Sequence, residues 1–333
     1  MEKVIIALDA MGGDYAPEQT VKGAVEAVNS SDEIRVILVG KQDLIQKELE
    51  KYQYSKEDIE VIHASEIIDM GDVPTVAIKD KKDSSLVVAM KLVRDGKADA
   101  VVSAGSTGAV LVGGQLVVGR LKGIKRPPLA PFIPTTKGFS LLIDCGANVD
   151  ARPEHLVQFA QMGSIYYENV MGKKNPTVAL LNIGTEEEKG NQLVKDTKPL
   201  MKECKNINYI GSVEARELVS GAADVIVCEA FVGNVVLKFF EGLALTMFGL
   251  LKDGLMSSTR TKLGAVLVKP ALKGLKNQFD TSSQGGAPLL GLKGLVVKAH
   301  GNSSSKEIEI ALKQCISFKK QKINEKIKES ICD

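Results

Sequence analysis

The sequence predicts an α/β protein, a three-layer α/β/α arrangement in which helices cover both faces of a mainly parallel sheet. Short β-branched runs alternate along the chain with longer stretches that have helical spacing. The runs are apolar throughout instead of alternating, which is typical of strands buried on both faces. Since no low-complexity linker divides the chain, we expect residues 1–333 to form one α/β domain with one sheet.

The expected strands lie at residues 4–8, 35–39, 59–63, 100–103, 140–144, 177–182, 208–210, 224–228 and 295–299. The clearest helices between them are 20–28, 84–94 and 153–170. A segment at 237–280 departs from this alternation, because it is apolar nearly all round in its first half and basic in its second half. We expect it to leave the domain as a helical hairpin.

Composition excludes several classes of protein. The net charge of +2 gives no general reason to bind nucleic acid. Five scattered cysteines without a C-x-x-C pair fit a reducing cytosol and argue against a zinc site or a disulfide framework. The start of the chain lacks the pattern of a signal peptide, and no uninterrupted apolar run reaches the ~18 residues of a spanning helix. We therefore expect a cytoplasmic protein that is able to lie on a membrane.

Small, polar and acidic residues follow most of the predicted strands. They are Asp9 to Asp14, with Gly12 and Gly13 between them, then His63, 145–148, 182–186, 229–234 and 300–303. Ligands of parallel α/β sheets bind beyond the carboxyl ends of the strands. The pattern therefore predicts a binding site along one edge of the sheet.

The turn Ser103-Ala104-Gly105-Ser106-Thr107-Gly108 lies between a predicted strand and an apolar, helical segment. Backbone N–H groups and hydroxyls converge in such a turn, at the positive end of the helix dipole, and form a cradle for an anion. The turn matches neither the dinucleotide nor the Walker pattern. A tight connection without a ligand would explain the turn equally well.

A second basic helix start lies at Lys81-Lys82-Asp83-Ser84-Ser85. Asp83 or Ser84 can cap the helix, and that structural role alone would explain the serines. Two lysines beside a capped helix start also form an anion site.

His63 and His300, at strand ends, are candidates for a general acid or base, whereas His155 is expected to be a surface or capping residue. No triad, nucleophile elbow or metal-binding histidine pair is present. Anion cradles without a protein nucleophile favour a reaction in which phosphate itself attacks an activated acyl group. A thiolate leaving group would need little acid assistance.

The basic half of the hairpin carries five cations and no acidic residue between 257 and 276; they are Arg260, Lys262, Lys269, Lys273 and Lys276. A dimer interface with a solvated basic face would explain this segment. An amphipathic surface that meets anionic lipid or an acidic protein would explain it too. Both hold if a dimer presents the hairpin.

Nine blocks in order resemble the bacterial phosphate acyltransferase family of phospholipid synthesis over essentially the whole chain. They lie at 9–14 (DAMGGD), 81–85, 103–109, 144–150 (DCGANVD), 152–156, 180–191 (LLNIGTEEEKGN), 231–238 (FVGNVVLK), 285–294 and 298–303 (KAHGNS). The resemblance implies transfer of a long-chain acyl group from acyl carrier protein to inorganic phosphate, which gives an acyl phosphate. It also implies a fold similar to phosphotransacetylases and isocitrate dehydrogenases, a homodimer, peripheral membrane contact and no cofactor or metal.

On this basis we expect the residues of 103–108 and 81–85 to hold phosphate, with Lys189. The expected catalytic residues are Asp9, His63, Lys81, Lys189, Asn234 and His300. The expected substrate-binding residues are Gly12, Gly13, Asp14, Ser84, Ser85, Ser103, Gly105, Ser106, Thr107, Gly108, Asn148, Asn182 and Glu186. Lys79, Ser106 and Glu229-Ala230 depart from the family pattern, which has Arg, Asn and Asp-Gly there.

Three other functions fit parts of the sequence. A phosphotransacetylase acting on short-chain acyl-CoA would share the chemistry but would need no lipid-facing hairpin. A metal- and NAD-dependent decarboxylating dehydrogenase of the related fold would need clustered aspartates and several arginines near the strand ends, and this chain has few such arginines. A non-catalytic membrane-surface adaptor would leave the polar strand ends without a purpose.

Overall fold

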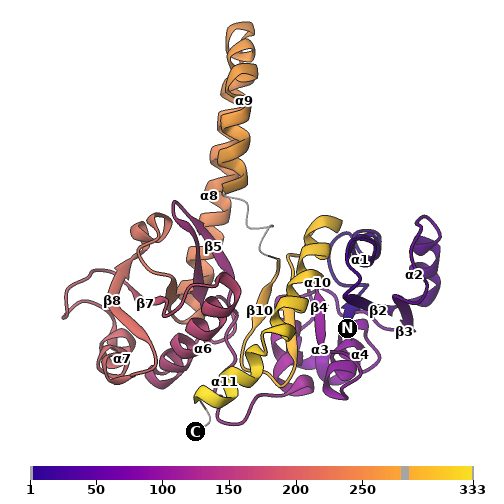
Figure 1. Ribbon diagram of the computed structural model, residues 1–333, viewed down its shortest axis with the longest axis horizontal. Coiled ribbons are helices and arrows are strands. Elements are labelled where there is room, and N and C mark those ends of the chain that lie inside the picture. Colours follow the sequence, from indigo (N-terminus) through magenta and orange to yellow (C-terminus); the bar gives the residue numbers. More distant parts are fainter. Residues whose placement is uncertain (1–2, 279–284, 332–333) are drawn as a thin grey trace.

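The computed structural model describes residues 3–278 and 285–331, and in them the strands form two sheets (Figure 1). The first is six-stranded, in the order β10-β11-β4-β1-β2-β3, and the second is five-stranded, in the order β5-β6-β9-β7-β8. The strands of the first lobe are β1 (Val4–Asp9), β2 (Ile34–Gly40), β3 (Ile59–His63), β4 (Ala100–Ser103), β10 (Ala287–Leu289) and β11 (Leu295–Lys298). Those of the second lobe are β5 (Phe132–Thr135), β6 (Gly138–Ile143), β7 (Thr177–Asn182), β8 (Asn208–Glu214) and β9 (Val225–Val227).

Helices cover both faces of each sheet, as the sequence predicts. In the first lobe these are α1 (Glu18–Asn29), α2 (Gln42–Leu49), α3 (Pro74–Asp80), α4 (Ser85–Arg94), α5 (Thr107–Gly113), the π-helical turn Gly114–Val118, and α10 (Ser305–Lys320). In the second they are α6 (Pro153–Met171), α7 (Gln192–Glu203), the 3₁₀ turn η2 (Ala215–Ser220) and the start of α8 (Ala230–Met256). Side chains of β1 alternate between the two faces: Ile6 and Leu8 join the core under α1 and α10, and Ala7 joins the core under α4.

The division into two sheets corrects the expectation that all strand ends share one sheet edge. The two sheets have no strand in common. They are joined instead by an apolar core that includes residues of α6, α10 and α11 (Ile323–Ile331). Tyr166 of α6 is fully buried, its ring lies 6.2 Å from that of Phe318 of α10, and its hydroxyl accepts a hydrogen bond of 2.8 Å from Gln314. This contact joins the lobes away from the strand ends.

Two strands were not predicted, namely β5 and β10, the strands that pair antiparallel with β6 and β11 at the sheet edges. Each is short and contains a proline, Pro134 or Pro288. Proline cannot donate a ladder hydrogen bond and is confined to edge positions, so these segments lack the long apolar pattern of the central strands.

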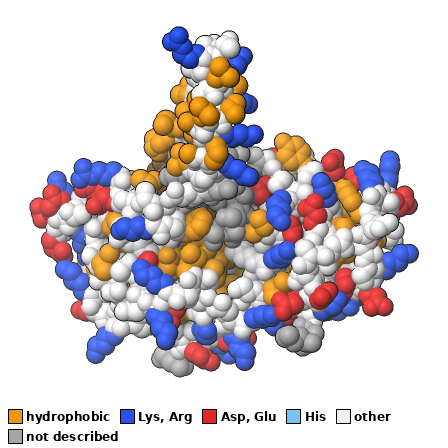
Figure 2. Space-filling view, turned by 45° about the horizontal axis from the view of Figure 1, so that its top comes forward, with side chains coloured by type: hydrophobic (Ala, Val, Ile, Leu, Met, Phe, Trp, Pro, Cys, Tyr) orange, Lys and Arg blue, Asp and Glu red, His pale blue; other side chains and the backbone are white. Residues whose placement is uncertain are grey.

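Helices α8 and α9 (Thr259–Gln278) project from the body as an arm (Figure 1). By length and composition α8 could cross a membrane, since an 18-residue window in it has a mean hydropathy of 1.5 and none of that window is buried. Apolar side chains and lysines lie side by side along the arm (Figure 2). The predicted hairpin began at 237, whereas the helix begins at Ala230; residues 279 and 280 lie outside the described part of the chain.

The base of α8 packs on the second sheet at a position where only glycine fits. A Cβ atom at Gly233 would overlap the carbonyl oxygen of Asp144 and lie 3.0 Å from the Cys228 sulfur. We therefore expect Gly233→Ala to lower the free energy of unfolding by about 1–3 kcal/mol, through overpacking against backbone. Urea unfolding followed by circular dichroism measures it.

The matched control is Gly242→Ala on the same helix, where nothing lies within 4 Å of the added Cβ. It should raise the free energy of unfolding by up to about 1 kcal/mol, because alanine favours helix over glycine. Equal unfolding midpoints for the two variants would contradict the packing argument.

Candidate functional site

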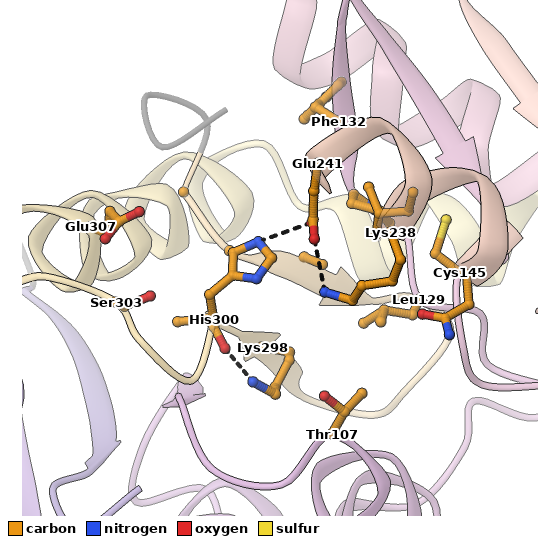
Figure 3. A pocket seen from close by; sticks show the side chains of 17 residues that line it. Thr107, Leu129, Phe132, Cys145, Lys238, Glu241, Lys298, His300, Ser303 and Glu307 are labelled. Atoms are coloured by element: carbon orange, nitrogen blue, oxygen red, sulfur yellow. Dashed lines mark hydrogen bonds and ion pairs between the residues drawn. The ribbon is translucent and has the colours of Figure 1, made fainter. Parts of the chain in front are cut away.

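A cleft of about 100 Å³ lies where the two lobes meet and takes side chains from both (Figure 3). The first lobe contributes the start of α5 and the segment that follows β11, and the second contributes β5, the end of β6 and the first turns of α8. Its polar and charged lining residues are Thr107, Cys145, Asn234, Lys238, Glu241, Lys298, His300, Ser303 and Glu307. The carboxyl ends of strands in two sheets thus meet at one site, as ligand sites of α/β proteins do.

Lys298 ends the buried strand β11 and lies opposite Ser103 of β4 in the parallel register. Its ammonium group donates to the carbonyl oxygens of Ala299 and of Ala104, the latter at 3.4 Å. Burial lowers the pKa of Lys298 to about 8, and the nearby charge of Lys238 adds to this effect. An anion in the cleft would be a favourable partner for this cation.

Three side chains form a chain of charges across the cleft (Figure 3). The Lys238 ammonium lies 2.8 Å from the Glu241 carboxylate, which in turn lies 3.7 Å from Nε2 of His300. Burial lowers the pKa of His300, Glu241 opposes this shift, and Lys238 and Lys298 add to it. His300 is thereby favoured as a neutral imidazole that can accept a proton.

Asp9 lies behind the cleft as a fully buried carboxyl at the end of β1. The Ser103 hydroxyl donates to Asp9 Oδ2 at 2.7 Å and accepts from the Gly105 N–H at 3.0 Å. Burial raises the pKa of Asp9, while hydrogen bonds from Ser85 and Ser103 lower it. In the part of the chain that the structure describes, Asp9 Oδ1 has no hydrogen-bond partner. The predicted residues Asp9, Ser85 and Ser103 therefore form one buried network.

The 9–14 loop packs closely on the turn that follows β4. A Cβ atom at Gly12 would lie 2.8 Å from the Gly105 nitrogen, and one at Gly13, with φ of +107°, would lie 3.0 Å from the Gly301 carbonyl oxygen. The Asp14 N–H donates to that same carbonyl at 2.7 Å. These residues hold the turn at 103–108 and the segment containing His300 in place.

The turn at 103–108 does form a helix start. Ser106 is the N-cap of α5 and accepts from the Ala109 N–H at 3.5 Å, Thr107 lines the cleft, and Gly108 packs on Pro74. The helical segment continues to Val118 through the π-helical turn.

The second predicted anion site is occupied by contacts within the protein. Lys81 lies 2.5 Å from Asp72 and donates to the Ile67 carbonyl, and the bond to Asp72 raises the pKa of Lys81. Ser84 is the N-cap of α4, as expected. The Lys81 charge is thus already paired with Asp72.

His63 ends β3, at the edge of the sheet two strands from β1. With about 4.8 Å between strands, this places it on the order of 10 Å from the strand that carries Asp9. Its Nδ1 accepts from the Gln42 N–H at 3.4 Å. His63 does not line the cleft that contains His300. His155 has the predicted capping role, since its Nδ1 accepts from the Arg152 N–H at 3.1 Å.

Asn148 is buried beneath the cleft, where its amide donates to Asp144 Oδ2 at 2.7 Å and to the Pro127 carbonyl at 3.0 Å. Burial raises the pKa of Asp144 to about 6, although the Leu129 and Ala147 N–H groups also donate to it. Asp144 and Asn148 thus fix Leu129 and Cys145, two walls of the cleft, and do not line it themselves.

The predicted residues after β7 lie in a loop of the second lobe. The Asn182 amide donates to the carbonyls of Gly184 at 2.8 Å and of Lys189 at 3.1 Å, so it closes this loop. Lys198 donates to the carbonyls of Glu186 and Lys189 from below. None of the three predicted residues lines the cleft with His300, whereas Asn234, on α8, does.

Comparison with known proteins identifies the family. A family model described as "Fatty acid synthesis protein" matches residues 4–326. A phosphate acyltransferase of Alkaliphilus oremlandii is 55% identical over 98% of this chain and 97% of its own length. One from Clostridium acetobutylicum is 49% identical over 97% of this chain and 98% of its own. The chain belongs to the phosphate acyltransferase family. It is an acyltransferase.

Solved structures of low sequence identity share the fold. A phosphotransacetylase from Streptococcus pyogenes superimposes with a TM-score of 0.66 at 17% identity, covering 94% of this chain and 93% of its own. A branched-chain phosphotransacylase from Enterococcus faecalis superimposes with a TM-score of 0.57 at 15% sequence identity. The match covers 94% of this chain and 98% of the phosphotransacylase. The three-layer α/β/α architecture predicted from the sequence is thereby confirmed.

Sequence reasoning missed the charged residues Lys298, Lys238 and Glu241 of the cleft. A signal for Lys298 existed, because this lysine ends an otherwise apolar strand and so lies at the sheet edge where ligands of parallel α/β sheets bind. Lys238 and Glu241 had a weaker signal. They are charged positions in the first half of an apolar helix, and Lys238 follows the predicted residue Asn234 by four residues, which places the two on one side of the helix.

His300 gives a direct test of the charge chain, because the protein has only three histidines to assign. We expect Glu241→Gln to lower the pKa of His300 further, since the carboxylate raises it, and Lys238→Met to raise it, since the ammonium lowers it. An NMR titration of the imidazole signals measures both. Shifts of the same sign in the two variants would rule out this arrangement of charges.

Proposed function

We propose that the protein transfers a long-chain acyl group from acyl carrier protein to inorganic phosphate, giving the acyl phosphate used in phospholipid synthesis. The observation that carries the proposal is the position of Lys298. Its buried cation lies beside the turn at 103–108 and within a cleft that also contains His300 and Lys238. The relatives named phosphate acyltransferase supply the reaction class.

The reaction needs a bound phosphate and a carbonyl held in reach of it. A phosphate oxygen forms a bond to the acyl carbonyl carbon, and the carbon–sulfur bond breaks as the carrier thiolate leaves. Neutral His300 can take the proton that phosphate gives up, and Lys298 stabilises negative charge that develops in the cleft. The thiolate leaves with little assistance, because a thiol has a pKa of only about 8.5.

A protein nucleophile is disfavoured by the state of the nearest thiol. Cys145 lines the cleft, but burial raises its pKa well above the ordinary value, so the thiol stays protonated. Direct attack by phosphate avoids this difficulty. The buried network around Asp9 then supports phosphate binding indirectly, because it fixes Ser103 and the Gly105 N–H at the base of the turn at 103–108.

We also propose a cytoplasmic protein, and a homodimer, that meets the inner face of the cell membrane through the arm. Large apolar side chains on α9 are exposed, among them Leu263, Val266 and Leu267 at 69%, 69% and 82%. Exposed cations of the same helix are Arg260, Lys262, Lys269 and Lys273; the side chain of Lys276 lies outside the described part of the chain. Apolar and cationic groups on one helix are the pattern of an interfacial anchor.

The activity is tested by supplying palmitoyl-carrier protein with phosphate and trapping acyl phosphate with hydroxylamine. We expect product from this donor and little from acetyl-CoA, and no effect of a chelator. Lys298→Met should lower kcat/KM by about 10²–10³, the usual cost of removing one group that stabilises a transition state. Lys97→Met, an exposed lysine on the body, is the control. Product from acetyl-CoA alone would favour a short-chain phosphotransacetylase instead.

The pH dependence has a defined sign. Lys298 is protonated below its pKa of about 8 and neutral above it, so the KM for phosphate should rise as the pH increases through about 8. Lys298→Arg should remove this rise, because arginine stays protonated throughout this range. Steady-state kinetics over about three pH units centred on this pKa of about 8 provide the comparison. A rise that persists in Lys298→Arg would assign the titration to another group.

Membrane contact is tested by sedimentation with vesicles that contain anionic lipid. The double variant Lys262→Gln/Lys269→Gln should weaken partitioning about 30-fold, at about 1 kcal/mol for each cation near the surface. The control double variant, Lys97→Gln/Lys195→Gln, removes two exposed lysines from the body. Equal partitioning of the two double variants would show that the arm is not the contact.

A further inference from the structure

A second cavity, of about 280 Å³, lies in the second lobe at the carboxyl ends of β7 and β9. Its lining is almost wholly apolar, with Leu156, Leu181, Leu193, Val194, Val232 and Val236 among its walls. The polar residues among its lining include Asn182, Asn191 and Glu229. Such a lining selects for an uncharged hydrocarbon.

This cavity and the cleft share the first turns of α8 as a wall. Val232 and Val236 line the cavity, and Asn234 and Lys238, two positions further along in each case, line the cleft. Two residues correspond to about 200° of helix rotation, so the two pairs lie on nearly opposite sides of the helix. Two neighbouring strands also end one in each space: Cys145, which follows β6, lines the cleft, and Cys228, which follows β9, lines the cavity.

The surface of α8 between these two sides is apolar and open. Phe231 and Val235 lie there and are 63% and 51% exposed. A helix with its side chains is about 10–12 Å across, so a group bound in the cleft reaches the cavity only through an extended tail of at least that length. Exposed apolar side chains at this crossing give the tail a surface to lie on.

The side of α8 that lines the cavity continues outward along the arm. At spacings of three and four residues, Val236 is followed by Phe239, Leu243, Met247 and Leu250, which are 69%, 48%, 60% and 66% exposed. A hydrocarbon tail thus has an apolar path between the cavity and the outer part of the arm. The path suits a molecule that enters or leaves through lipid.

We propose that this cavity binds the distal part of the substrate's long acyl chain while the thioester lies in the cleft. The proposal rests on the proposed function for the position of the thioester. Short acyl groups end before the cavity and gain nothing from it. The cavity therefore determines chain-length preference: each methylene buried in it strengthens binding about 4-fold, so an apolar cavity of this size favours long donors over short ones many-fold.

The test fills the cavity without disturbing the core. Ala215 lines the cavity and is exposed at the start of η2, so Ala215→Trp places an indole in the cavity at little cost to folding. We expect it to lower kcat/KM at least 10-fold for palmitoyl-carrier protein and to leave that for hexanoyl-carrier protein within 2-fold. Val219→Trp, in the same short helix but outside the cavity, should change neither.

A second variant and a binding measurement keep the test decisive. Val236→Ser makes the lining polar and should reduce the preference for the long donor in the same direction. The fluorescent long-chain fatty acid cis-parinaric acid should bind the wild-type protein and bind Ala215→Trp at least 10-fold more weakly, in buffer without vesicles. Unchanged chain-length preference and unchanged probe binding in both variants would overturn the proposal. Absence of product from every acyl donor would instead overturn the proposed function.

Discussion

The apolar core shared by the two lobes is the constraint on which the site depends. Neither sheet alone forms the cleft, because Lys298 and His300 come from one lobe and Lys238 and Glu241 from the other. The Tyr166 ring against Phe318, with the Gln314 hydrogen bond to its hydroxyl, joins α6 to α10 behind the cleft. Buried aromatic rings prefer a small range of packing geometries, so this contact helps to hold the two lobes, and with them the two groups of side chains, in place.

Helix α8 connects every functional region of the molecule. Its first turns are anchored because Glu229 caps them, accepting from the N–H groups of Phe231 and Val232, and because Gly233 contacts the Asp144 carbonyl. One side then faces the cleft and another the apolar cavity, and the outer turns form the arm. A substitution at the base of this helix would therefore affect the charge chain, the cavity and the arm together, whereas one in the outer turns would affect the arm alone.

Much of the fold could be predicted because buried parallel strands have a strong sequence pattern. The strands at 59–63, 100–103 and 177–182 have the predicted bounds. The division into two sheets could not be predicted, since each strand looks the same whichever neighbour it pairs with. At the site, Asp9 and Ser103 were found because each ends a predicted strand, and the structure places these two strands next to each other. The pairing of Lys81 with Asp72, and the position of Asn182 outside the cleft that contains His300, depend on loop paths that no local pattern records.

The balance of charge in the cleft bears on how phosphate could act as a nucleophile. Glu307 is held by the Ser304 N–H and hydroxyl at the start of α10, and Glu241 pairs with Lys238. Among the described charged side chains that line the cleft, this leaves Lys298 as the cation without a carboxylate partner. Several cations around phosphate would stabilise the ground state as much as the transition state and would gain no rate. A single unpaired cation attracts phosphate to the cleft without binding it as tightly as several cations would, so the sparse charge of this cleft suits attack by phosphate better than tight storage of it.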